Sequence, residues 1–272
     1  MQRQWSYFWG LLFSKKNFVR YLPATSPSLF DYTFDENNHK WYHWAYLVPE
    51  FMYNHSLRFT EILVPTEETI KTMWIIRKHL DLRMPIVLIG DTGTSKTASV
   101  QTLMRSLDKS KYSMMTINFS SCTTSMDVQR NLEANIEKRA KGIYGPTPGK
   151  LLVTFIDDMN MPMIDKYGTQ QPIAMLKLLI EKKGMYDRGK ELTWKKMKDL
   201  SYVAGMGLPG GGRNAVDQRF LSSFSVIYCL NPPNMSLLKI FGSILNGHTF
   251  TFDDSIRNIV DKITSITLKA YE

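Results

Sequence analysis

The sequence predicts an α/β fold, with a doubly wound parallel sheet flanked by helices. Short apolar runs such as Ile86–Ile89 and Leu151–Ile156 are typical of strands buried on both faces. These runs alternate with stretches whose apolar residues recur at helical spacing, as expected of a parallel sheet. A glycine-bearing turn also joins the first run to a segment that begins with Lys96 and Thr97.

The composition is typical of a globular protein of 272 residues with a formal net charge of +9. This charge is compatible with an acidic partner such as nucleic acid, tubulin or a membrane surface. The lysines form short clusters at expected helix ends and loops, which favours a solvated basic surface instead. Two cysteines, Cys122 and Cys229, without metal-ligand spacing indicate a reducing compartment. No apolar run has the length of a membrane span.

Residues 1–60 are rich in aromatic residues and irregular in pattern, so we expect an N-terminal extension. The apolar stretch Trp5–Phe13 lacks a small-residue cleavage site and runs into two lysines. This favours an amphipathic helix over a signal peptide. The aromatic residues between positions 41 and 53 have no accompanying basic stripe. We therefore expect them to pack rather than to stack on bases.

Caps and apolar spacing predict the elements of the first half. Thr66 precedes two glutamates that complement a helix dipole, so we expect it to cap a helix. The strand at 86–89 is followed by a helix, a strand at 114–119, and a helix capped by Thr124 or Ser125. The apolar faces of these two helices comprise Val100, Leu103, Met104 and Leu107, and Val128, Leu132 and Ile136.

Glycine and proline positions predict the elements of the second half. The glycines and prolines at 142–149 predict a loop before the strand at 151–156. Pro172 predicts a helix start, and Lys182, Lys183 and a following Gly184 predict its end. A hairpin is expected at 185–194, with further strands at 201–206 and 224–230.

The turn after the first strand has the residues of a phosphate-binding loop. A helix N-terminus carries partial positive charge and free N–H groups, and it attracts phosphate. Lys96 adds a full charge, and the Thr97 hydroxyl can hold Mg²⁺. The sequence therefore predicts ATP or GTP binding. Ser95 stands where the general pattern has a glycine that lets the backbone approach phosphate. The predicted binding residues are Gly90, Asp91, Thr92, Gly93, Thr94, Ser95, Lys96 and Thr97.

Two carboxylates, Asp157 and Asp158, end the apolar strand at 151–156. Ligands of parallel sheets bind beyond the carboxyl ends of the strands, so both should lie near the phosphate loop. We expect Asp157 to hold Mg²⁺ and Asp158 to act as the catalytic base or water-orienting carboxylate. Aspartate is one methylene shorter than the usual glutamate, which predicts slow hydrolysis.

With these residues the chain resembles an AAA+ module of a dynein heavy chain, and in particular the third module of the axonemal motors. The likeness runs from about residue 20 to the last residue. Its motifs are residues 62–66 (ILVPT), the phosphate loop, 118–121 (NFSS), 156–162 (IDDMNMP), 167–172 (YGTQQP), 210–214 (GGGRN) and 217–220 (DQRF).

The resemblance implies an AAA+ P-loop NTPase that binds ATP or ADP with Mg²⁺. Val64 and Pro65 would pack against adenine. Arg219 matches the arginine-finger position and would act on the site of a neighbouring module. A surface ion pair is its alternative role. Arg213 is a weaker candidate for the finger, because we expect its glycine-rich neighbours to form a mobile loop.

The same resemblance implies three regions: an extension at 1–60, the large AAA+ α/β domain at 61–232, and the start of a small helical lid at 233–272, truncated. We therefore expect a fragment of a motor in the cytoskeleton of the cilium axoneme. The implied partners are the neighbouring AAA+ modules, dynein intermediate and light intermediate chains, and microtubules. Neither direct nucleic-acid binding nor membrane binding is expected.

The sequence leaves the function open among three hypotheses. AAA+ modules usually have a polar residue, often asparagine, where this chain has Gly205, Met206 and Gly207. Together with Ser95 and Asp158, this suggests weak hydrolysis and favours a scaffold role. The preferred hypothesis is regulatory nucleotide binding with slow hydrolysis. The first alternative is a structural scaffold that does not hydrolyse nucleotide. The second is a nucleic-acid-dependent P-loop ATPase, and only the positive net charge of the chain supports it.

Overall fold

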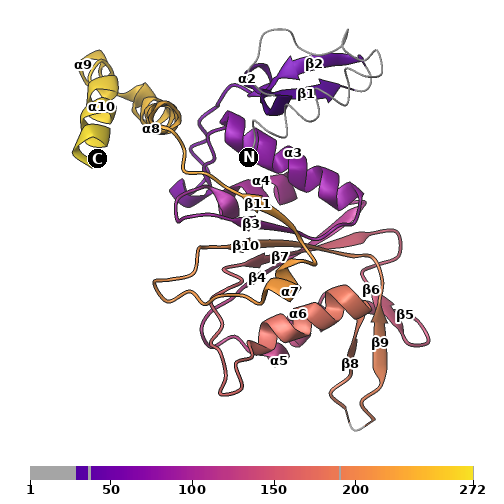
Figure 1. The fold of residues 1–272 in the computed structure, drawn as a ribbon. Helices are drawn as coiled ribbons and strands as arrows, with labels where there is room; N and C mark the ends of the chain where they lie inside the picture. Colours follow the sequence, from indigo (N-terminus) through magenta and orange to yellow (C-terminus); the bar gives the residue numbers. More distant parts are fainter. Residues whose placement is uncertain (1–28, 36–37, 190, 272) are drawn as a thin grey trace, which may run out of the picture. The chain divides into compact units, whose positions relative to one another are not determined.

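The computed structural model describes residues 29–35, 38–189 and 191–271 (Figure 1). The predicted helix at Trp5–Phe13 lies outside these residues. The chain divides into two compact units. One contains residues 59–63 and 72–233, and the other contains residues up to 58 together with 64–71 and those from 234 onward. Each unit is described by itself below.

The larger unit is built on a five-stranded sheet in the order β11-β3-β10-β7-β4. All neighbouring strands are parallel. This confirms the predicted α/β fold. The strands are β3 (Ile86–Ile89), β4 (Tyr112–Asn118), β7 (Leu151–Asp157), β10 (Leu200–Met206) and β11 (Ser225–Tyr228).

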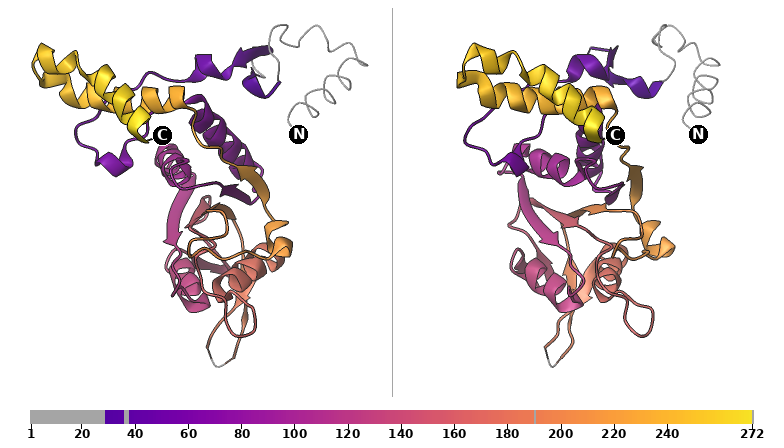
Figure 2. Two further views of the ribbon diagram at one scale, coloured as in Figure 1. Left: turned by 60° about the vertical axis from the view of Figure 1, so that its left-hand side comes forward. Right: turned by 90° about the vertical axis from the view of Figure 1, so that its left-hand side faces the viewer.

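Helices cover both faces of this sheet, as a doubly wound fold requires (Figures 1 and 2). Along β3, Ile86 and Leu88 face one core and Val87 faces the other, because side chains alternate along a strand. The first core includes residues of α3 (Glu67–Asp81) and α4 (Lys96–Ser106). The second includes residues of α5 (Ser125–Glu133), α6 (Gln171–Lys182) and α7 (Gln218–Leu221).

Two predicted helix caps are present. The Thr66 hydroxyl accepts a hydrogen bond from the Thr69 N–H at 3.3 Å. Thr124, rather than Ser125, caps α5 in a reciprocal capping box with Asp127. The prediction that α5 carries Ile136 was wrong, because the helix ends at Glu133. Ile136 nevertheless packs against the core that α5 covers.

A second sheet in this unit has the order β5-β6-β9-β8. Its strands β8 (Gly184–Tyr186) and β9 (Trp194–Met197) form the predicted hairpin. The prediction of a loop throughout 142–149 was wrong, because β6 (Ile143–Gly145) lies within it and pairs with β5 (Glu137–Ala140) and β9. Pairing with a strand fifty residues away overrides the local glycine and proline signal.

Gly184 does not end α6 in the way predicted. Lys183 adopts the left-handed conformation at the helix end (φ 51°, ψ 44°), and Gly184 already begins β8. The glycine is required for a different reason. A Cβ at position 184 would lie 2.4 Å from Trp194 Cζ2 and 2.7 Å from the Lys195 carbonyl oxygen.

The smaller unit contains a hairpin of β1 (Tyr32–Asp35) and β2 (Lys40–His43), followed by α2 (Trp44–Leu47). Trp44 is buried, whereas Tyr46 is 84% exposed, so the predicted packing of the aromatic residues holds only for some of them. The remaining helices are α8 (Asn234–His248), α9 (Asp254–Arg257) and α10 (Val260–Tyr271), with 3₁₀ turns at Leu29–Asp31 and Thr249–Thr251. The 3₁₀ turn Phe59–Glu61 belongs to the larger unit. No helix in the described part of the chain is long and apolar enough to cross a membrane.

We expect Gly184→Ala to lower the free energy of unfolding by about 1–3 kcal/mol, because the added methyl group has no space beside Trp194. Urea denaturation measures the change. Gly189→Ala in the same hairpin is the matched control, since its nearest neighbour would be 3.8 Å away. Equal stability of the two variants would contradict the packing argument.

Candidate nucleotide-binding site

The predicted phosphate loop lies at the carboxyl edge of the parallel sheet, between β3 and α4. Two neighbouring strand ends contact its first residue. The Gly90 N–H donates to the Met206 carbonyl oxygen at 3.3 Å, next to the end of β10. A Cβ on Gly90 would lie 2.5 Å from the Cys229 carbonyl oxygen, just beyond β11. The loop therefore has a glycine where two strand ends approach its backbone.

The loop turns into α4 through two residues with positive φ. Gly93 has φ 89°, and Ser95 has φ 59° and ψ 16°. The left-handed conformation disfavours a residue with a Cβ, by roughly 1–2 kcal/mol. The Ser95 hydroxyl makes no capping hydrogen bond to α4 that would offset this cost. The departure from glycine thus places backbone strain directly before Lys96.

The Lys96 ammonium group folds back onto its own loop. It donates to the carbonyl oxygens of Gly90 at 2.8 Å and Asp91 at 2.6 Å, and to the Thr94 hydroxyl at 2.9 Å. Burial lowers the pKa of Lys96, and the nearby Arg213 guanidinium also lowers it, while Cys229 and the two carboxylates act in the opposite direction. The site therefore favours an added negative charge beside this lysine.

Thr97 and Asp157 lie together, although sixty residues separate them. The Thr97 hydroxyl donates to Asp157 Oδ2 at 2.8 Å. The Asp158 N–H donates to Asp157 Oδ1 at 3.1 Å. Burial raises the pKa of Asp157, the hydrogen bond from Thr97 opposes this, and the Asp158 charge adds to it. The structure thus brings together the hydroxyl and the carboxylate for which magnesium binding was predicted. Their role stays a prediction.

Asp158 points to a different neighbour. Its backbone is left-handed (φ 50°), its side chain is 49% exposed, and its Oδ1 lies 3.6 Å from Nη2 of Arg213. The Arg213 side chain crosses the end of β10 at Gly207, where a Cβ would lie 2.6 Å from Arg213 Nε. Hydrogen bonds of Gly210, Arg213 and Asn214 hold the loop around Arg213, and its mobility stays a prediction.

Val64, Pro65 and Arg219 are the remaining predicted site residues. Val64 is buried and Pro65 is partly exposed, and both belong to the smaller unit, so their contact with adenine stays a prediction. Arg219 lies in α7 and is exposed. Its role as a finger toward a neighbouring module also stays a prediction.

Sequence reasoning missed two contributions to this edge. Asn160 is fully buried, and its amide donates to the Gly207 carbonyl oxygen at 2.9 Å. This bond ties the end of β10 to the segment after β7. The signal in the sequence was an asparagine close behind Asp158. Gly207 was interpreted as a missing polar group, whereas the structure shows that it makes room for Arg213.

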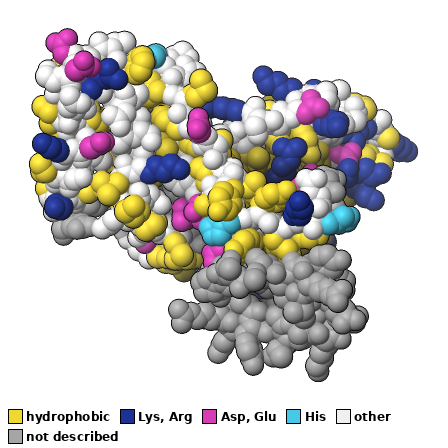
Figure 3. Space-filling model, turned by 90° about the horizontal axis from the view of Figure 1, so that it is seen from above, with side chains coloured by type: hydrophobic (Ala, Val, Ile, Leu, Met, Phe, Trp, Pro, Cys, Tyr) yellow, Lys and Arg dark blue, Asp and Glu magenta, His cyan; other side chains and the backbone are white. Residues whose placement is uncertain are grey.

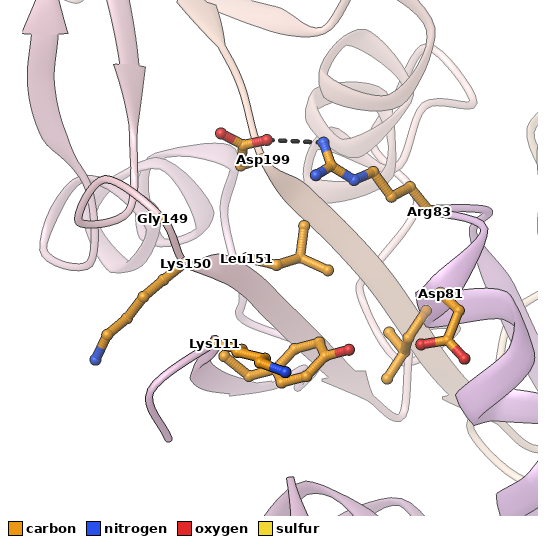
Figure 4. Close-up of a pocket in the computed structure, with 9 residues that line it drawn as sticks. Asp81, Arg83, Lys111, Gly149, Lys150, Leu151 and Asp199 are labelled. Carbon is orange, nitrogen blue, oxygen red and sulfur yellow. Dashed lines mark hydrogen bonds and ion pairs between the residues drawn. The ribbon is translucent and has the colours of Figure 1, made fainter. Parts of the chain in front are cut away.

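An open pocket of about 370 Å³ lies at the opposite, amino-terminal edge of the sheet (Figure 4). Arg83 and Asp199 form an ion pair there at 2.8 Å. Leu151, the first residue of β7, lines this pocket, whereas the phosphate loop lies at the carboxyl ends of the strands. The two sites are therefore separate. It is lined by Leu80, Asp81, Arg83, Lys111, Tyr112, Gly149, Lys150, Leu151 and Asp199.

Figure 3 shows where Lys and Arg side chains lie on one face of the described residues. Lys and Arg side chains there are interspersed with hydrophobic, acidic and uncharged ones. Electrostatic binding along a nucleic-acid backbone requires clustered cations. This view does not test the nucleic-acid hypothesis, which stays a hypothesis.

Comparison with known proteins shows the family to which the chain belongs. The family described as the P-loop containing dynein motor region matches residues 51–232. Since this match spans most of the chain, the chain belongs to that family. The resemblance to dynein heavy chains found in the sequence is confirmed.

The chain is 50% identical over 251 residues to human dynein axonemal heavy chain 10, covering 92% of this chain and 6% of the relative. It is 43% identical over 264 residues to the dynein-1-alpha heavy chain of the flagellar inner arm I1 complex of Chlamydomonas reinhardtii, covering 96% and 6%. Human dynein axonemal heavy chain 2 is 33% identical over 259 residues. The chain therefore spans about 6% of the length of these relatives. Their axonemal and flagellar names indicate the cilium axoneme as its location, as predicted.

We expect Ser95→Gly to stabilise the chain by about 0.5–1 kcal/mol, because glycine relieves the left-handed strain and loses part of the gain to backbone entropy. Thermal unfolding measures the change. Ser95→Ala keeps the strain and serves as the control, with stability close to that of the wild type. A stabilisation by alanine equal to that by glycine would contradict the assignment of strain to this residue.

We expect Asp157→Asn to stabilise the nucleotide-free chain at pH 7, because it removes a partly buried charge. Because burial raises the pKa of Asp157, the folded chain binds its proton more tightly than the unfolded chain does. The contribution of Asp157 to wild-type stability should therefore rise as the pH falls through its raised pKa, and the difference in stability between the two proteins should shrink. Denaturant titrations at several pH values test this. A difference independent of pH would contradict it.

Proposed function

We propose that this chain binds ATP with Mg²⁺ at the phosphate loop, as the ATP-binding AAA+ module of an axonemal dynein heavy chain. The observation that carries the proposal is the hydrogen bond between Thr97 and Asp157 beside Lys96. It joins a helix N-terminus, a lysine and a carboxylate at one edge of a parallel sheet. Dinucleotide- and nucleotide-binding sheets bind their ligands at such edges.

The residues at this edge fit a magnesium–triphosphate group. Mg²⁺ prefers oxygen ligands, and the Thr97 hydroxyl and Asp157 carboxylate supply two that already lie 2.8 Å apart. Burial raises the pKa of Asp157, so a cation beside it would relieve an unfavourable buried charge. When bound, Mg²⁺ would neutralise charge on the phosphates. Lys96 would bind the phosphates directly.

In this proposal the role of the module is regulatory, with nucleotide binding and slow hydrolysis contributing to ATP-driven movement along microtubules and of the cilium. Asp158 would orient the attacking water. Its shorter side chain and its ion pair with Arg213 support a low rate. Arg219, exposed on α7, would act on the nucleotide of a neighbouring module. Neighbouring AAA+ modules, microtubules, and dynein intermediate and light intermediate chains are the proposed partners within the parent complex.

A second candidate is a scaffold module that keeps its nucleotide without hydrolysing it. Ser95 and Asp158 favour this candidate, because both depart from the residues usual at a hydrolytic site. Both also have a left-handed backbone. The two candidates differ in nucleotide exchange. The test denatures the purified chain to identify bound nucleotide and measures whether the native chain exchanges it for labelled ATP. A permanently held nucleotide does not exchange, whereas a regulatory ligand does.

We expect Lys96→Ala to weaken Mg·ATP binding by roughly 10- to 100-fold, because the loss of a charge-assisted contact to phosphate costs on this order. Isothermal titration calorimetry of the 272-residue chain measures it. Chelation of Mg²⁺ should weaken ATP binding in the wild type.

Lys111→Ala is the control for this experiment, because Lys111 lies at the opposite edge of the sheet (Figure 4). It removes the same charge from the chain and should leave ATP binding unchanged. Equal losses in the two variants would show that net charge, not the phosphate loop, governs binding. Absence of ATP binding in the folded wild type would rule the proposal out.

A further inference from the structure

The loop that follows β10 is held in place at both of its ends. Gly210 and Arg213 exchange backbone hydrogen bonds at 3.0 and 3.1 Å, around glycines with positive φ. The Asn214 N–H donates to the Asn160 carbonyl oxygen at 2.9 Å, and its amide donates to the Pro162 carbonyl oxygen at 2.9 Å. The loop is thereby tied to the segment that follows Asp157 and Asp158. The Arg213 side chain thus extends from a hydrogen-bonded turn that lies next to the two carboxylates.

Gly207 determines where the Arg213 side chain passes. A Cβ on Gly207 would lie 2.6 Å from Arg213 Cδ and Nε and 3.1 Å from its Cζ. No larger residue fits while the arginine keeps this position. The guanidinium consequently occupies the end of β10, the place at which the sequence lacks its expected polar group.

The guanidinium has hydrogen-bonding capacity to spare. Its contact with Asp158 is long, at 3.6 Å, and the two side chains are 29% and 49% exposed. The buried Nε of Arg213 has no hydrogen-bond partner among the described residues. A guanidinium presents five donors in a planar fork that suits phosphate oxygens. Asp158 therefore satisfies only part of what this arginine can donate.

The charge around Arg213 favours a polyanion. Lys96 directly precedes Thr97, whose hydroxyl bonds Asp157, while Arg213 lies 3.6 Å from the adjoining Asp158. Two cations thus converge on one edge of the sheet. Thr97 and Asp157 lie at the same edge, and Asp158 adjoins them. A phosphate chain that starts at the phosphate loop and reaches Asp158 would end beside Arg213.

We propose that Arg213 binds the terminal phosphate of the nucleotide held by this same chain, and that Gly207 is the residue that admits it. This inference rests on the proposed ATP binding and adds a residue to that site. Asp158 is the partner of Arg213 without nucleotide, and the phosphate replaces it. The exchange releases Asp158 only when the nucleotide is a triphosphate. Arg213 then makes the site distinguish ATP from ADP.

The test compares Mg·ATP and Mg·ADP binding to the full 272-residue chain by calorimetry. Arg213→Ala should weaken ATP binding about tenfold or more while changing ADP binding less than about threefold. Arg213→Lys should fall between the wild type and alanine, since it keeps the charge but loses the fork. Gly207→Ala should reproduce the alanine result by displacing the arginine.

Arg83→Ala is the matched control, because it removes an arginine that pairs with an aspartate at the opposite edge (Figure 4). It should change neither affinity. Thermal unfolding by circular dichroism verifies that each variant is folded, and Arg213→Lys decides the matter should either small-residue variant fail.

Equal weakening of ATP and ADP binding, or no weakening of either, would overturn the role of Arg213. Wild-type binding with unchanged Arg213 variants would refute this inference alone. A wild type that binds neither nucleotide would refute the proposed function together with it.

Discussion

The hydrogen bond between Thr97 and Asp157 is the constraint on which the candidate site depends. It fixes the first turn of α4 to the end of β7, two strands away from β3 in the sheet. The close fit of this edge continues across β10, where a Cβ on Gly205 would lie 3.1 Å from Asp157 Oδ1. The first turn of α4 and the end of β7 are therefore fixed relative to each other, and Lys96 and Asp158 lie next to the two residues that join them.

Several groups at this edge are in states that a stability-optimised protein would avoid. Asp157 is a partly buried carboxylate, Lys96 is a partly buried ammonium group, and Ser95 and Asp158 have left-handed backbones. The core beneath them is fully buried at residues such as Phe155. Strain and unfavourable charge gather where a ligand would relieve them, whereas the packing below the edge is ordinary. This distribution is common at functional sites.

Much of the fold followed from local patterns, because strands buried on both faces and capped helices leave strong signals. The central strands and the Thr124 cap could be predicted from neighbouring residues alone. The second sheet could not, because β6 exists through pairing with β9, which is distant in the sequence. Gly184 was misassigned for a related reason, since its requirement comes from Trp194 across the hairpin. At the site, the loop lysine and the acid pair were visible as motifs. The path of Arg213 across Gly207 was not, because it depends on how a turn folds back.

Gly90 gives the phosphate loop a mechanical connection to the rest of the chain. Its backbone lies so close to the Cys229 carbonyl oxygen that no side chain could separate them, and the Cys229 N–H donates to the Ile89 carbonyl oxygen at 2.7 Å. A displacement of the loop backbone at Gly90 would therefore also displace the backbone at Cys229. From there only residues 230–233 lead to the first residue of α8. The phosphate loop is therefore connected to α8 through backbone contacts at Cys229 and the four residues that follow.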